Sequence, residues 1–74
     1  MNYMRGKEID EKILSFLKEQ EWPSTTEDVA KAISASWQTA QIHLFKLQND
    51  GNVKYRRVGR QNQWWFKKNY EENF

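Results

Sequence analysis

The chain has 74 residues, the size of one small domain near the lower limit of what a hydrophobic core stabilises unaided. It contains no cysteine and only one histidine, which excludes a disulfide framework, a zinc site of Cys and His ligands, and a Cys–His catalytic pair. The formal net charge of +2 is small, but the charges are unevenly distributed.

No apolar run approaches the roughly 20 residues that a membrane span needs, and no segment resembles the apolar part of a signal peptide. We therefore expect one cytoplasmic domain over residues 1–74, with its core at about 7–68 and without a membrane partner. Residues 1–6 show no periodicity and are expected to lead into the first helix.

A first helix is predicted from about Lys7 to Gln20, because apolar residues recur on one of its faces at Ile9, Ile13, Phe16 and Leu17. Pro23 ends any continuation of this helix, since its ring disfavours the helical conformation at the preceding residue. That residue is Trp22, which we expect to cover the edge of the core.

A second, shorter helix is predicted after Thr25. This hydroxyl lies three residues before the carboxylate of Asp28, a variant of the capping box. The following helix has a small apolar face made of Val29, Ala30 and Ile33. A break at 34–36 then joins it to the next helix, which predicts a helix-turn-helix unit.

The stretch Ser36–Gly51 predicts the longest helix. Ser36 is a good N-cap, and Gly51 supplies the left-handed residue that ends many helices. A narrow apolar stripe recurs at Ala40, Leu44 and Leu47. The opposite face lacks the charged residues of a solvated helix, so we expect it to contact a partner; it carries Trp37, Gln38, Gln41, Ile42 and Phe45.

After Gly51 the apolar period changes to that of a strand, and a β-hairpin is predicted. Its first strand alternates Val53, Tyr55 and Arg57 with Lys54, Arg56 and Val58. A turn is expected at 59–62 and a second strand at 63–67. We expect Trp64 and Phe66 to face the core, Trp65 to be more exposed, and Phe45 to pack against the aromatic residues of the hairpin.

The second half of the chain is basic. Residues 1–42 hold five basic and seven acidic side chains, whereas residues 43–68 hold one acid, Asp50, against Lys46, Lys54, Arg56, Arg57, Arg60, Lys67 and Lys68. A basic patch on a nearly neutral domain suits a polyanionic partner.

The order of elements resembles the winged helix-turn-helix of MarR-, ArsR- and related archaeal and bacterial regulators. The matching patterns are T-x-x-x-V-A-x-x-I from Thr25 to Ile33, and S-x-x-T-A-x-x-x-L-x-x-L-x-x-x-G-x-V from Ser36 to Val53. The resemblance covers about residues 7–67. It implies an α+β fold in which three helices are followed by a two-stranded β-hairpin wing.

The resemblance also implies sequence-specific binding of double-stranded DNA and a role in transcription regulation. A second copy of the chain or another protein is left open as a further partner. In a helix-turn-helix the start of the second helix meets base edges in the major groove, here through Ser36, Trp37, Gln38 and Gln41. Glutamine pairs well with adenine. The wing is expected on the backbone or in the minor groove, through Lys54, Arg56, Arg57, Arg60, Gln61 and Asn62.

Further backbone contacts are expected at Thr26 and Lys31, and His43 is expected to pack or lie on the surface. No nucleophile–base pair, paired carboxylates or ligand pocket is evident, so we expect neither an enzyme nor a cofactor or small-molecule ligand. A rival class is a winged helix that docks on protein through an apolar patch of Trp37, Ile42, Phe45 and Trp65. The cations of the wing favour DNA over this rival.

A narrower likeness is to the Zα domains, winged helices that bind left-handed nucleic acid. The chain is similar to them in having an amide at Gln41, an aromatic residue at Phe45, and a wing tryptophan at Trp64 or Trp65. It departs from them where Gln41 and Phe45 replace the usual Asn and Tyr, and it lacks the prolines before the wing tryptophan.

Overall fold

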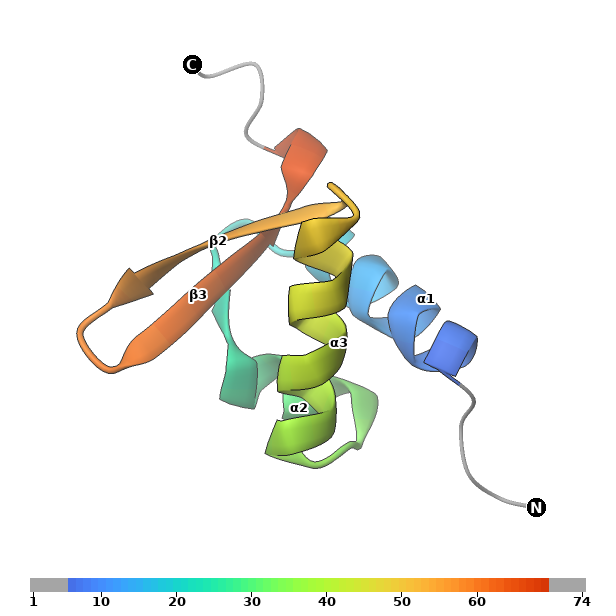
Figure 1. The fold of residues 1–74 in the computed structure, drawn as a ribbon. Coiled ribbons are helices and arrows are strands. Elements are labelled where there is room, and N and C mark those ends of the chain that lie inside the picture. The colour runs from blue at the N-terminus through green and yellow to red at the C-terminus, as the bar shows by residue number, and fades with distance from the viewer. Residues whose placement is uncertain (1–5, 70–74) are drawn as a thin grey trace.

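The computed structural model describes residues 6–69, which form three α-helices and one three-stranded sheet. The helices are α1 (Gly6–Lys18), α2 (Thr26–Ile33) and α3 (Trp37–Asn49), and a short 3-10 helix covers Lys67–Asn69. The strands are β1 (Ser24–Thr25), β2 (Val53–Val58) and β3 (Gln61–Phe66). The hairpin of β2 and β3, called the wing below, projects beside α3 and away from the other helices (Figure 1).

This is the predicted α+β arrangement of three helices followed by a β-hairpin. The lead-in expected at residues 1–6 lies outside the described residues, apart from Gly6, which begins α1. Within residues 6–69, none of the helices has the length and apolarity of a membrane span.

The core forms where the apolar stripes of the three helices meet the inner face of the sheet. The predicted stripes are buried except for Phe16, which packs partly buried against the core. The sheet adds two residues, and the core consists of Ile9, Ile13, Leu17, Val29, Ala30, Ile33, Ala40, Leu44, Leu47, Val53 and Trp64. Removing these side chains from water is the main favourable contribution to folding. It fixes which side of α3 faces outward.

The predicted helix caps are confirmed. The Thr25 hydroxyl accepts a hydrogen bond from the Asp28 N–H at 3.1 Å, and the Asp28 carboxylate accepts one from the Thr25 N–H at 3.2 Å. The Ser36 hydroxyl accepts from the Thr39 N–H at 3.1 Å and starts α3. Gly51 follows α3 with φ of 86°, the left-handed conformation predicted for it.

The sheet has one strand more than predicted, and the turn of the wing is shorter than the predicted turn at 59–62. Strand β1 pairs with β3, so that the strand order is β1-β3-β2. A two-residue strand is too short to give a periodic signal, which is why the sequence did not indicate it. The wing turn consists of Gly59 and Arg60 alone, because Gln61 and Asn62 already pair with β2.

The expectation that Trp22 covers the core edge is wrong, since its side chain is 78% exposed. The buried position of this segment belongs instead to Ser24, which lies opposite Trp64 in the sheet. The inward direction of Trp64 is confirmed, as it is fully buried, and Phe66 packs partly buried against the same core.

One polar cluster joins α1 to α3. The Asp10 carboxylate lies 2.7 Å from His43 Nδ1 and 2.5 Å from Lys46 Nζ, one partner on each oxygen. Partial burial raises the pKa of Asp10, but the hydrogen bonds from Lys46 and His43 outweigh this effect and hold it below its ordinary value. The hydrogen bond to Asp10 in turn raises the pKa of Lys46. His43 thus has a packing role, as expected.

Asp10→Asn should therefore destabilise the fold by about 1 kcal/mol at neutral pH, a value discounted for the exposure of Lys46. A carboxyl group whose pKa is lower in the folded state contributes stability above its unfolded pKa and loses it as the pH falls. The difference between wild type and variant, measured by urea unfolding at neutral pH and at a pH below the lowered pKa of Asp10, should be lost at the lower pH. Glu11→Gln, a neighbouring exposed carboxylate, is the control. An equal difference at both pH values would contradict the stabilising role of ionised Asp10.

Candidate functional site

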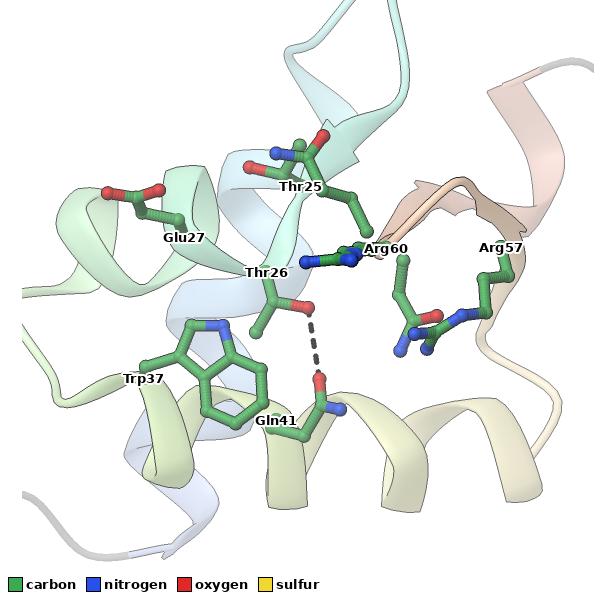
Figure 2. A pocket seen from close by; sticks show the side chains of 9 residues that line it. Thr25, Thr26, Glu27, Trp37, Gln41, Arg57 and Arg60 are labelled. Carbon is green, nitrogen blue, oxygen red and sulfur yellow. Dashed lines mark hydrogen bonds between the residues drawn. The ribbon is translucent and has the colours of Figure 1, made fainter.

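A cleft of about 280 Å³ lies where the wing, the start of α2 and the first half of α3 meet. Its walls are Thr25, Thr26, Glu27, Trp37, Gln41, Arg57, Arg60, Gln61 and Asn62. The sequence indicated no pocket, because the walls come from three segments far apart in the chain. Figure 2 shows Trp37 and Gln41 along α3, with Arg57 and Arg60 reaching over from the wing.

The cleft brings together six of the ten residues predicted for DNA binding: Trp37, Gln41, Arg57, Arg60, Gln61 and Asn62. Ser36 and Gln38 lie outside it at the start of α3, and both are exposed. Thr25 and Glu27 were missed, since a capping residue and a lone acid on a helix give no functional signal.

A chain of hydrogen bonds runs from the buried Trp64 to two residues that line the cleft, Thr26 and Gln41. The Trp64 indole N–H donates to the Thr26 hydroxyl oxygen at 2.8 Å. The Thr26 hydroxyl lies 3.0 Å from Gln41 Oε1, the dashed line in Figure 2. An indole nitrogen only donates, so Thr26 accepts from Trp64 and uses its one proton to donate to Gln41. The network thereby assigns the Gln41 oxygen to Thr26 and leaves its NH₂ group as the available donor.

This network bears on two predictions. Paired recognition of adenine by Gln41 needs its oxygen and its NH₂ group to face the same base, and the hydrogen bond from Thr26 directs the oxygen toward the protein. Gln41 is left to donate to a phosphate oxygen or to an acceptor on a base edge. Thr26 itself is 3% exposed, so the direct backbone contact expected of it is wrong.

Three aromatic rings fix the wing against α3. Phe45 meets Tyr55 and Trp64 edge-on, with ring centroids at 5.2 Å and 5.0 Å, and Tyr55 stacks on Trp64 at 4.7 Å. Such pairs contribute beyond their burial, by about 0.5–1.5 kcal/mol each. The expectation that Phe45 packs against the wing aromatics is confirmed, so Phe45 supports the site from beneath.

The strand register divides the wing cations between two faces. Side chains alternate along a strand, and Tyr55 faces the core side with Trp64 opposite it. Arg57, two residues further, lies on that same side and lines the cleft. Lys54 and Arg56 belong to the other face of the sheet, opposite Trp65 and Gln63. The predicted basic wing is therefore two separate pairs of cations.

The Ser36 hydroxyl, at the start of α3, takes part in capping this helix. The Ser36 hydroxyl accepts from the Thr39 N–H and donates to the Thr39 hydroxyl at 3.0 Å. Trp37 follows with its ring 52% exposed beside the cleft. On α2, Lys31 lies 3.5 Å from Glu27, and both side chains are exposed, so this pair partly offsets the acid at the cleft wall.

In the described part of the chain, 6–69, no group of three or more His, Asp or Glu side chains is arranged to bind a metal ion. The Glu27 carboxylate and the hydroxyl groups of Thr25 and Thr26 line the cleft together with two guanidinium groups and three amides. The guanidinium and amide groups suit an anionic or hydrogen-bonding partner.

Comparison with known proteins gives a family and a fold. A family model described as "FaeA-like protein" matches residues 9–68. Among curated proteins, none matches the chain significantly.

Among solved structures, the Zα domain of Carassius auratus PKZ in complex with Z-DNA is 24% identical, with a TM-score of 0.74 over 82% of this chain and 95% of that chain. The apo Zα domain of zebrafish PKZ is 23% identical, with a TM-score of 0.75 over 85% and 97%. A structure of HOP2, described by its DNA recognition and protein interaction domains, is 22% identical, with a TM-score of 0.72 over 78% and 97%. At these identities the likeness shows the winged-helix fold.

The chain of hydrogen bonds can be tested with two substitutions of Thr26. Thr26→Val keeps the shape but leaves the Trp64 N–H buried without an acceptor, at a cost of about 1–3 kcal/mol. Thr26→Ser keeps the hydroxyl and loses only a methyl group, about 0.8 kcal/mol. Urea unfolding measures both, and hydrogen exchange of the Trp64 indole should be faster in the valine variant alone. Equal stability and equal exchange in the two variants would refute the network.

Proposed function

The chain belongs to the FaeA-like protein family, and on that premise we propose that it binds double-stranded DNA as a sequence-specific transcription regulator. In this proposal α3 enters the major groove, and the wing follows the backbone or the minor groove. The observation that carries the proposal is the cleft, where two guanidinium groups and one amide donor converge beside the exposed half of α3.

The electrostatics of this surface fit a polyanion. The segment from Trp37 to Asn49 contains no acidic residue, and neither does the wing from Val53 to Phe66. Arg57 and Arg60 extend from the wing toward the side of α3 that carries Gln41 (Figure 2). A DNA backbone that runs between α3 and the wing would present its phosphates to these donors.

In this proposal, contacts with the DNA backbone position the protein, and contacts with the bases read the sequence. A guanidinium group holds a phosphate through two parallel hydrogen bonds, and the Gln41 NH₂ group adds a third donor. These contacts fix the register of the protein on DNA without reading sequence. Base reading then belongs to the outward residues of α3, among which Gln38 is exposed.

A protein-docking role for the same surface is less well supported. Of the four residues in that hypothetical patch, Phe45 is engaged in the ring cluster with Tyr55 and Trp64. The exposed Trp37 lies in the same cleft as Arg57 and Arg60, cations that an apolar partner would have to desolvate. The positive charge of Arg57 and Arg60 favours nucleic acid over an apolar protein as the partner of this surface.

The salt dependence of duplex binding tests the proposal. Each phosphate contact adds about one unit to the slope of log affinity against log salt. Replacing Arg57 and Arg60 together by alanine should therefore reduce this slope by about two units on a random-sequence duplex, as measured by fluorescence anisotropy.

The control is the double variant Lys54→Ala/Arg56→Ala, which removes the same charge from the other face of the wing. It should change the slope by less than half as much. Absence of binding by wild type at low salt would refute the proposal. Equal effects of the two double variants would show that the cleft is not the site of phosphate contact.

A second candidate is binding of left-handed duplex, favoured by the contact of Phe45 with Trp64 and by the Zα domains among the matched structures. The contact brings together two of the residues on which the Zα likeness was drawn, the helix aromatic residue and a wing tryptophan. Phe45, however, has no hydroxyl group to hydrogen-bond a phosphate.

We expect the chain to leave an alternating dC–dG duplex right-handed, because Phe45 lacks that hydroxyl group and the oxygen of Gln41 is engaged by Thr26. Circular dichroism of the duplex during titration is the measurement. Inversion of the spectrum upon protein addition would establish the second candidate, and Phe45→Tyr should then strengthen it.

A further inference from the structure

Ile42 is an exposed apolar residue at the middle of the outer face of α3. Its side chain is 66% exposed, more than that of Trp37 or of any apolar residue of the wing. Exposed single hydrophobic residues are common on protein surfaces, so exposure alone carries no function. The position of Ile42 relative to the other faces of α3, in contrast, indicates a function.

Each side of α3 is assigned by a contact. Ala40, Leu44 and Leu47 face the core. His43 and Lys46 bind Asp10 on α1, and Gln41 and Phe45 contact Thr26 and the wing rings. With 3.6 residues per turn, Gln38 and Ile42 fall between the last two groups, opposite the core stripe. They form the outward row, the part of α3 that reaches deepest into any groove the helix enters.

The outward row combines one amide with one branched aliphatic side chain. In the major groove the edges of the base pairs present hydrogen-bonding groups and a single apolar feature, the C5-methyl group of thymine. An isoleucine at the floor of the groove gains apolar contact only there. Beside hydrogen-bonding base edges it would displace water without replacing the hydrogen bonds.

We infer that Ile42 is a specificity-determining residue that recognises the thymine methyl group, an inference that rests on the DNA binding proposed above. Gln38, one turn earlier on the same row, is exposed and can turn its oxygen and its NH₂ group to the same adenine, whereas the oxygen of Gln41 is directed at Thr26. The outward row thus reads A·T pairs, and Arg57 and Arg60 hold the neighbouring backbone.

The test compares two duplexes that differ only in that methyl group. One alternates dA and dT, and in the other deoxyuridine replaces thymidine, which keeps base pairing and charge. Burying one methyl group corresponds to about fourfold in affinity. Wild type should bind the thymidine duplex about fourfold more tightly per contacted thymine, and Ile42→Ala should bind both duplexes equally.

Val58→Ala is the matched control, since Val58 is another exposed β-branched residue, at 43%, but lies on the wing. It should keep the preference of wild type. Equal binding of both duplexes by wild type would overturn the inference and leave DNA binding intact. A preference that survives in Ile42→Ala would also overturn it, by assigning the effect to DNA shape or another residue. Absence of binding to either duplex at low salt would refute the proposed function itself.

Discussion

The burial of Trp64 is the constraint on which the rest of the structure depends. Its ring fills the space between α3 and the wing, against Phe45 and Tyr55, and its N–H must find an acceptor inside the protein. Thr26, the first residue of α2, supplies that acceptor and donates a hydrogen bond of its own to Gln41. One buried side chain therefore joins the wing, α2 and α3, and sets the orientation of an amide at the surface.

Much of the fold could be predicted because local patterns specify it. The helical stripes, the caps at Thr25 and Ser36, and the inward register of Trp64 all follow from spacing along the chain. What could not be predicted depends on residues far apart in sequence. The engagement of Gln41 by Thr26, the pairing of β1 with β3, and the exposure of Trp22 are decided by which segments meet in space.

The candidate site shows the same division. The alternation of the predicted strand already separates Arg57 from Lys54 and Arg56, and the register agrees with it. The meeting of Arg57 and Arg60 with Gln41 in one cleft could not be predicted, because it depends on how the wing packs beside α3. The structure also gives the outer face of α3 a simple order. Its wing side is used for packing and for the cleft, its α1 side is held by Asp10, and the row between them, Gln38 and Ile42, is left to meet a partner.

We expect duplex DNA to meet the outward row of α3 and the cleft together. An NMR titration of the ¹⁵N-labelled chain with random duplex DNA at low salt measures this contact residue by residue. Shifts are expected in the side-chain amides of Gln38 and Gln41, the indole of Trp37, and the guanidinium N–H signals of Arg57 and Arg60. The exposed indole of Trp22, on the loop before β1, should stay unchanged. Shifts centred on Trp22 and α1, with α3 and the wing unaffected, would show that DNA binds to another face of the protein.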